Sequence, residues 1–209
     1  MANQDAAFGF RAIGGMGSSY ETQGTSKYQI ADNSTSAIFQ GDLCMFGAFN
    51  GSTGDANANN VAAGYISCSS VTEDTLNMGV FNGCFYIDPT TAKRPWKNYY
   101  PGAINITTGT IDAYCYDNPQ QLYVAQTSGT MTQVVAGGLV ATDTYAAGST
   151  INGQSACEIA GAVTGAGATD QWRIIRLSED PSNSDTGNPN SNWVVRLNES
   201  VYYNGAVLT

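Results

Sequence analysis

The sequence contains no histidine among its 209 residues. Histidine is the side chain best suited to proton transfer near neutral pH, and it is the commonest metal ligand. Its absence excludes a serine or cysteine hydrolase triad of the ordinary kind and most catalytic zinc sites. Without histidine, catalysis would have to depend on carboxylates, tyrosines or lysines. Because the side chain most used for proton transfer and metal binding is missing, we expect no catalytic residue, no cofactor and no metal ion.

Charged residues are also scarce, and most of them are negative. They make up 12% of the chain, with 8 basic and 17 acidic residues and a net charge of −9. This share is about half of the usual one, so the surface must be mostly neutral and polar. A negatively charged chain repels a phosphate backbone. We therefore expect no nucleic-acid partner.

The chain lacks a long apolar run. Positions 118–142 carry no charge, but Gln, Thr, Ser and Gly interrupt them too often for a membrane span. The N-terminus has no basic start followed by an apolar segment, which predicts that no signal peptide is present. We therefore expect a protein that is made in the cytoplasm and has no membrane partner.

The cysteines are odd in number, widely spaced and without a CxxC pair. This pattern favours reduced thiols that serve as small core side chains. A disulfide framework is the alternative, which the length of the chain makes unnecessary. The five cysteines are Cys44, Cys68, Cys84, Cys115 and Cys157.

Short runs of β-forming residues recur between clusters of Gly, Asn, Ser and Asp, and no segment shows a helical stripe with caps. This pattern predicts an all-β fold, an antiparallel β-barrel or sandwich with two β-rich lobes. We expect an irregular, glycine-rich arm over residues 1–26, a barrel-like lobe over 27–126 and a second β lobe over 127–209, unless the two lobes form one domain.

The best-defined expected strand begins at Val80, because apolar residues alternate onto both of its faces up to Ile87. A strand of this kind is central in its sheet. Gly79 and Gly83 within it predict a bulge or a close approach of another backbone. Near the end of the chain, "QWRIIRL" and "NWVVRLNE" predict an antiparallel pair joined by a long polar loop.

The segment "KRPWKNYYP" combines aromatic side chains with three of the eight basic residues. Its prolines exclude a central strand, so we expect an edge or a loop. Basic and aromatic residues together are typical of a protein-docking surface; the alternative is an aromatic plug at one barrel end with solvated charges. With those of the glycine-rich arm, the predicted docking residues are Phe8, Phe10, Arg11, Lys93, Arg94, Trp96, Lys97, Tyr99 and Tyr100.

Acidic residues offer only weak candidates for chemistry. Adjacent residues of a strand point to opposite faces, and the remaining pairs fall at turns, which disfavours a glycosidase-type dyad. Two oxygen-rich clusters have partial calcium-loop character, but hydrogen-bonded turns explain them more simply. The carboxylate pairs are Glu73 with Asp74, Asp112 with Asp117 and Glu179 with Asp180; the clusters are Asp55 with Asn57 and Asn59, and Asp180 with Asn183 and Asp185.

Several segments, taken in order, resemble virion structural proteins of tailed phages that infect marine bacteria, interpreted in those phages as capsid decoration or cement proteins. They are "FGFRAIGG", "KYQIADNSTSAIFQGDLC", "GVFNGCFYIDP", "STINGQSACEI", "WRIIRLSEDPSNS" and "NWVVRLNES", and they span nearly the whole chain.

The resemblance implies a non-enzymatic protein that binds the major capsid protein on the outer surface of the virion. It also implies a homo-oligomer, for example a trimer, that is made in the host cytoplasm. A net charge of −9 favours the exterior of the shell, because packaged DNA would repel it. Two alternatives stay open: a tail or fibre adhesin that stacks Tyr and Trp on host glycan, and a carboxylate-based carbohydrate-active enzyme.

Overall fold

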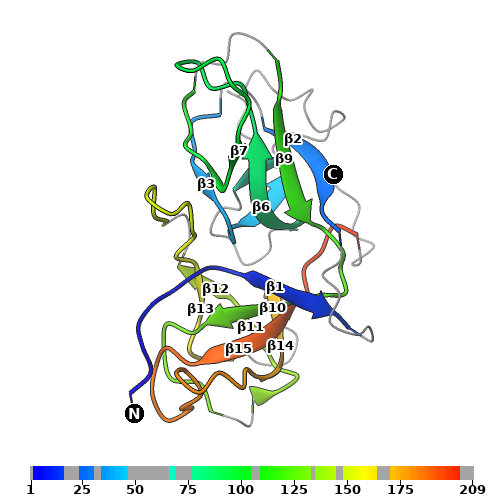
Figure 1. Cartoon of the computed structure of the whole chain (residues 1–209). Helices are drawn as coiled ribbons and strands as arrows, with labels where there is room; N and C mark the ends of the chain where they lie inside the picture. Colours follow the sequence, from blue (N-terminus) through cyan, green and yellow to red (C-terminus); the bar gives the residue numbers. More distant parts are fainter. Residues whose placement is uncertain are drawn as a thin grey trace.

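The computed structural model confirms the all-β prediction. It describes residues 2–16, 24–30, 34–46, 66–68, 77–104, 109–132, 135–144, 148–163 and 170–202. Within these ranges every element of regular structure of two or more residues is a β-strand. The strands form two lobes, one above the other in Figure 1, and each lobe is built around its own antiparallel sheet.

The upper lobe contains a six-stranded sheet, in which β6 pairs with β9, β4 and β7. The central position predicted for the strand at Val80 is therefore confirmed. Its core is formed by buried side chains such as Ile30, Phe81 and Ile111. The sheet follows the order β2 (Ser26–Ile30), β9 (Ile111–Tyr116), β6 (Gly79–Phe85), β4 (Leu43–Phe46) and β5 (Ile66–Cys68), with β7 (Trp96–Lys97) also on β6; β3 (Ile38–Phe39) and β8 (Tyr99–Tyr100) form a separate pair.

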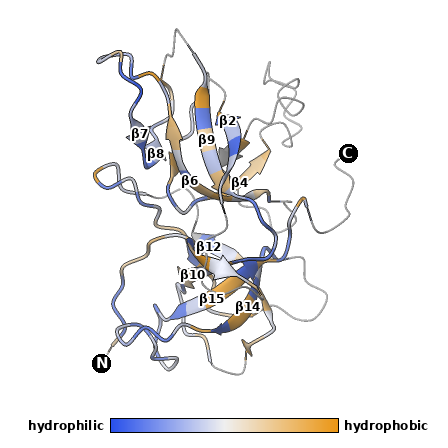
Figure 2. Cartoon of the chain, turned by 45° about the vertical axis from the view of Figure 1, so that its right-hand side comes forward, coloured by the Kyte–Doolittle hydropathy of each residue, from blue (hydrophilic) through white to orange (hydrophobic). Residues whose placement is uncertain are grey.

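The lower lobe contains a five-stranded sheet packed around the buried Trp172 and Trp193. In Figure 2, orange marks hydrophobic residues on β6 of the upper lobe and on β14 of the lower lobe. The antiparallel pair predicted near the end of the chain is confirmed as β14 and β15. The sheet follows the order β1 (Arg11–Gly15), β10 (Gln121–Gln126), β15 (Asn192–Leu197), β14 (Trp172–Leu177) and β11 (Leu139–Val140), beside the pair β12 (Thr142–Thr144) and β13 (Glu158–Ile159).

Two segments depart from the sequence-based expectation. Arg11–Gly15, expected to be irregular, is strand β1, which pairs with β10 and has a bulge between Ala12 and Gly14. Strand β10 was expected in the N-terminal lobe but lies in the lower sheet between β1 and β15. The chain therefore passes from the upper to the lower lobe between β9 and β10, because strand pairing over long sequence distances outweighs chain order.

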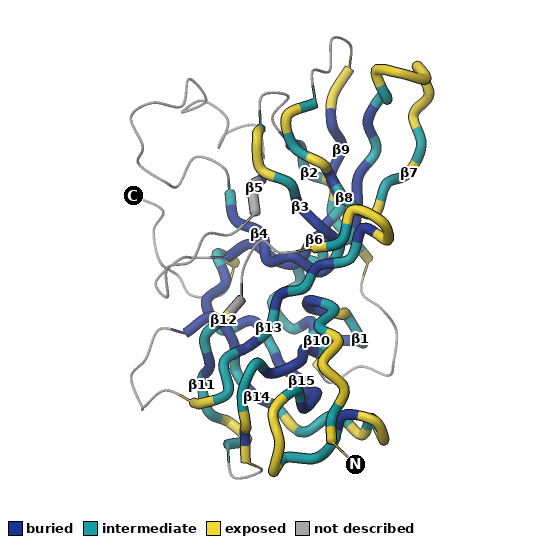
Figure 3. Tube along the Cα trace, turned by 90° about the vertical axis from the view of Figure 1, so that its left-hand side faces the viewer, coloured by how far each residue is buried: buried dark blue, intermediate teal, exposed yellow. Residues whose placement is uncertain are grey.

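The two lobes share buried surface. Leu43 and Val80 belong to strands of the upper sheet, yet their side chains lie in the core cluster of the lower lobe. A parallel β-bridge also joins Gln40 to Gln154. Figure 3 shows buried residues running from one lobe into the other. The lobes therefore pack against each other through apolar side chains and backbone hydrogen bonds.

Asp42 lies buried at this junction and is fully hydrogen-bonded on both carboxylate oxygens. Its Oδ2 accepts from the backbone N–H of Phe39 at 2.7 Å, and its Oδ1 accepts from the Cys157 thiol at 3.3 Å. A buried carboxylate is tolerated when such donors replace water. Asp42 thus connects the upper turn to a residue of the lower core.

The thiols agree with the expectation of reduced core cysteines. Four cysteines with described side chains are free and buried: Cys44, Cys84, Cys115 and Cys157. Burial raises the pKa of Cys84 to about 12, although the nearby Lys97 acts in the opposite direction. The Cys84 thiol is therefore protonated at neutral pH. Within the described ranges, no helix has the length and apolar character needed to cross a membrane.

Candidate functional site

The candidate site is the outer face of the upper sheet. On β9 the buried Ile111, Ala113 and Cys115 point into the upper core. Alternation along a strand therefore directs Asp112 and Tyr114 to the opposite face. The strand register places Phe85 of β6 beside Asp112, and Trp96 of β7 beside Phe85.

Three aromatic side chains on this side of the sheet contact one another, and we call Phe85, Trp96 and Tyr114 the aromatic face. The ring centroids of Phe85 and Trp96 are 5.0 Å apart at an interplanar angle of 70°. Those of Phe85 and Tyr114 are 5.9 Å apart, and those of Trp96 and Tyr114 are 5.7 Å apart. Such edge-to-face contacts hold the rings in place. Trp96 remains 39% exposed, so a partner can contact a surface that is already formed.

Gly83 allows the indole of Trp96 to lie against the sheet. A Cβ atom at Gly83 would be 2.3 Å from Cζ2 of Trp96, so only glycine leaves room for the ring. The register of β6 against β9 shifts between Phe81 and Gly83, which is a β-bulge. The sequence predicted a bulge or a close backbone approach at this glycine. The register shift agrees with the first, and the carbonyl oxygen of Lys97, 2.8 Å from the added Cβ, agrees with the second.

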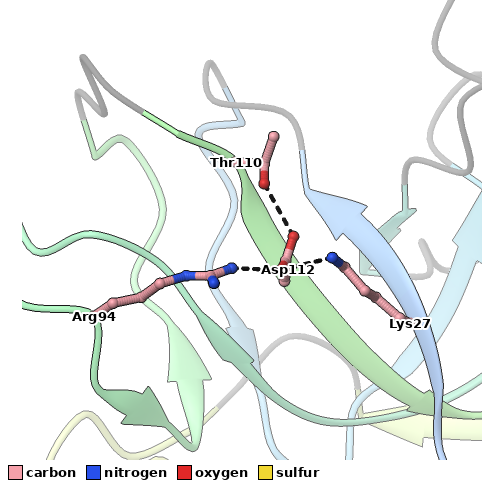
Figure 4. Close-up of polar contacts among 4 residues, drawn as sticks. All are labelled: Lys27, Arg94, Thr110 and Asp112. Atoms are coloured by element: carbon pink, nitrogen blue, oxygen red, sulfur yellow. Dashed lines mark hydrogen bonds and ion pairs between the residues drawn. The ribbon is translucent and has the colours of Figure 1, made fainter.

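Asp112 joins two cations at the border of the aromatic face (Figure 4). Its Oδ2 is 2.8 Å from Nζ of Lys27 and also accepts from the guanidinium of Arg94. Its Oδ1 accepts a hydrogen bond from the hydroxyl of Thr110 at 3.0 Å. The guanidinium of Arg94 also lies 5.9 Å from the ring centroid of Phe85. Two cations therefore share one carboxylate, which leaves one net positive charge beside the rings.

The environment of Asp112 changes its pKa in two opposite directions. Burial favours the neutral acid, but the hydrogen bonds from Lys27, Thr110 and Arg94 outweigh this effect and lower the pKa below its ordinary value. A carboxyl whose pKa is lower in the folded state stabilises the fold above its unfolded pKa. That contribution is lost as the pH falls through the folded pKa.

Replacing Asp112 by Asn should therefore remove part of the acid sensitivity of the protein. At neutral pH we expect the variant to be less stable by about 1 kcal/mol, because both cations are half exposed and their pairing is screened. The difference should begin to shrink near pH 4, about the unfolded pKa, and should be lost once the pH falls through the lower folded pKa. Urea unfolding at a series of pH values measures it, with the exposed Asp143→Asn as the control. An unchanged pH dependence in D112N would contradict the assignment.

The structure separates the basic residues of the predicted docking segment. Lys93 and Arg94 are exposed, beside the exposed Trp96. Lys97 lies opposite Cys84 in the strand register, so it points to the other side of β7 from Trp96. The structure thus brings Arg94 and Trp96 to the aromatic face and directs Lys97 away from it.

The two tyrosines of the same segment pack within the upper lobe. Tyr100 is fully buried, and its hydroxyl donates to the backbone carbonyl of Ser34 at 3.0 Å. Tyr99 stacks on Phe39, with ring centroids 5.5 Å apart. Part of the segment therefore packs inside the lobe, as the alternative of an aromatic plug predicts. We remove Tyr100 from the docking residues, because its side chain cannot reach a partner.

The three residues predicted in the N-terminal arm also lie in different environments. Phe10 is only 2% exposed and stacks on Trp172 with ring centroids 4.0 Å apart, so it belongs to the lower core and not to a docking surface. Phe8 is half-buried, and Arg11 is exposed with its guanidinium 4.5 Å from the ring centroid of Phe8. Because β1 pairs with β10, these residues lie at the lower sheet, whereas Trp96 lies on β7 of the upper sheet.

The described cluster considered for calcium, Asp180 with Asn183 and Asp185, forms hydrogen bonds within the protein. Asp180 accepts hydrogen bonds from the Ser182 backbone and the Asn192 side chain, and Asn183 donates to the carbonyl of Gln4. In the part of the chain that the structure describes, no three or more acidic or cysteine side chains come together as a metal site would require. Two of the predicted groups lie outside the described residues: the cluster of Asp55, Asn57 and Asn59, and the pair Glu73 and Asp74.

Two hollows lie near the start of the chain. The first has a volume of about 240 Å³ and lies between the lobes, and no carboxylate lines it. The second, of about 380 Å³, is lined by one carboxylate, that of Asp180. Neither of these two hollows therefore contains the pair of acids that the enzyme alternative predicts. The predicted pair Asp112 and Asp117 is divided, since Asp112 binds Lys27 while Asp117, just after β9, accepts from the hydroxyl of Tyr28.

No protein-family model, no curated protein sequence and no solved structure matches this chain.

Proposed function

We propose that the protein is a non-enzymatic decoration protein that binds the outer surface of an icosahedral phage head and stabilises it. Its partner would be the major capsid protein, contacted through the aromatic face. The supporting observation is the preformed cluster of Phe85, Trp96 and Tyr114, bordered by cations on a chain of net charge −9. Aromatic and arginine side chains are the residues that most often carry binding energy at protein interfaces.

The distribution of charge supports this orientation. The three lysines of the chain, Lys27, Lys93 and Lys97, and Arg94 all belong to the upper lobe, and together they are half of the 8 basic residues. An acidic patch on the capsid would attract this end, while the remaining acidic surface would face solvent. We propose that copies form a homo-oligomer, for example a trimer, so that many weak contacts retain each copy.

Replacing Trp96 by Ala should weaken attachment to empty capsids at least tenfold, since Trp is the commonest type of hot-spot residue. Co-sedimentation of purified protein with capsids over a concentration series measures this change. A matched control is Val163→Ala, because Val163 is 37% exposed and lies in the lower lobe, whereas Trp96 is 39% exposed. W96A attachment equal to that of wild type would contradict docking through the aromatic face.

The exposed indole also favours a second candidate, a tail or fibre adhesin that stacks Trp96 on a sugar ring of the host surface. Antibody labelling of virions distinguishes the two functions. Label distributed over the head supports decoration, and label confined to the tail supports the adhesin and rejects decoration.

A further inference from the structure

The hollow between the lobes has features of a ligand site, and we call it the inter-lobe pocket. Its volume is about 240 Å³. Liquid water occupies about 30 Å³ per molecule, so this volume corresponds to about eight water molecules. It is large enough for one six-membered sugar ring and larger than a lone carboxylate group needs. Both lobes contribute walls: Phe8, Arg11 and Ala12 come from the segment around β1, and Asn82 and Tyr116 come from β6 and β9.

The pocket presents donors that the protein itself leaves unused. The guanidinium of Arg11 contacts the ring of Phe8 but forms no ion pair or hydrogen bond with any described residue. Asn82 accepts from Gln40 through Oδ1 at 3.1 Å, and its Nδ2 has no described partner. The hydroxyl of Tyr116 has none either, and burial raises its pKa, so it keeps its proton at neutral pH.

The other walls are both apolar and polar. Phe8 and Ala12 are half-buried and offer apolar surface, and Gln40 and Gln154 add neutral amides. Apolar surface beside a few convergent polar groups is typical of small-molecule sites. Here the donors are a cation and neutral groups, while no carboxylate lines the pocket. The ligand should therefore be an anion that also carries hydroxyl groups and an apolar face.

A carboxylate fits this pocket better than a phosphate. The planar fork of arginine matches a carboxylate with two parallel hydrogen bonds. Phosphate is usually held by several cations or by backbone N–H groups at a helix N-terminus. The inter-lobe pocket has one cation, Arg11, and no helix occurs among the described residues.

We propose that the inter-lobe pocket binds one carboxylate-bearing sugar residue of the uronic acid type. Arg11, held by Phe8, would donate to the carboxylate. Asn82 and Tyr116 would donate to ring oxygens, and the apolar face of the ring would contact the half-buried Phe8 and Ala12. The proposal goes beyond capsid attachment and does not depend on it, because the pocket and the aromatic face use different residues.

Saturation-transfer NMR and titration of the whole protein test this site, with methyl glucuronoside as the probe. We expect saturable binding in the millimolar range, as for other small, exposed sites. The neutral methyl glucoside should bind at least tenfold more weakly, because it lacks the charge-assisted hydrogen bonds to Arg11. Arg11→Gln should reduce binding of the acid by the same factor. The control is Arg176→Gln, an exposed arginine of the same sheet that lies outside the pocket.

Arg11 is exposed, so the substitution should leave the fold intact, and far-UV circular dichroism verifies this. Three results would each overturn the proposal. The first is no saturable signal with the sugar acid, and the second is equal binding by wild type and R11Q. The third is binding of N-acetylglutamate or inorganic phosphate as tight as that of the sugar acid. Capsid co-sedimentation of R11Q is measured separately, so failure here and failure of the decoration function are distinguishable.

Discussion

Replacing Trp172 by Ala should lower the free energy of unfolding by about 3–5 kcal/mol, the usual range for removing a buried aromatic side chain. The indole is fully buried, stacks on Phe10 at 4.0 Å between centroids and meets Tyr123 edge-on at 5.6 Å. Its Nε1 donates to the hydroxyl of Thr142 at 2.8 Å. The substitution therefore leaves a cavity in the centre of the lower core, and the hydroxyl of Thr142 loses its donor.

The same variant tests whether the lobes unfold together. Leu43 and Val80 of the upper sheet pack into the cluster that contains Trp172, so we expect one cooperative transition shifted as a whole. Urea unfolding followed by far-UV circular dichroism and by tyrosine fluorescence measures it. Trp172→Phe keeps a stacked ring but loses the bond to Thr142 and leaves a smaller cavity, so an intermediate loss of about 2 kcal/mol is expected. Two separate transitions, with the upper one unchanged, would show independent lobes.

Much of the local structure could be predicted from the sequence, because side-chain alternation is a local signal. Apolar residues on both faces after Val80 indicated a strand covered on both sides, and β6 is central. The pair β14 and β15 followed in the same way from two alternating segments. In each case the pattern within about eight residues contained the information needed.

Long-range pairing could not be predicted in this way. Arg11–Gly15 ends in two glycines, so it shows no alternation, and its partner β10 begins more than a hundred residues later. The stacking of Phe10 on Trp172 also depends on that pairing. The local composition of this segment indicated an irregular arm. Pairing with the distant strand β10 instead makes it the edge strand of the lower sheet.

The candidate site shows the same limit. Arg94 and Trp96 lie in one conspicuous segment and could be found from composition. Lys27, Asp112 and Tyr114 were missed as site residues, because they reach the same face from β2 and β9 only through strand register. The buried Tyr100 was included for the opposite reason, since composition does not reveal which way a side chain points.

Gly79 was expected to mark a close backbone approach, and the structure shows how close it is. A Cβ atom at Gly79 would lie 2.1 Å from the carbonyl oxygen of Tyr116 and 2.9 Å from its carbonyl carbon. Both atoms are backbone, and Tyr116 is the register partner of Val80, so neither strand can move without breaking the pairing of β6 with β9. The free-energy cost of adding a methyl group here should therefore lie at the upper end of the range for overpacked sites.

Gly79→Ala should consequently destabilise the protein by about 3 kcal/mol, measured by urea unfolding. The near-ultraviolet circular dichroism of the aromatic face should weaken as well, since Phe85 and Tyr114 lie on the two strands that are forced apart. Gly24→Ala is the matched control, because Gly24 is exposed and its added Cβ would meet nothing within 4 Å. A loss of stability below about 0.5 kcal/mol in G79A would mean that β9 yields freely at Tyr116. The aromatic face would then not be a rigid surface prepared for a partner.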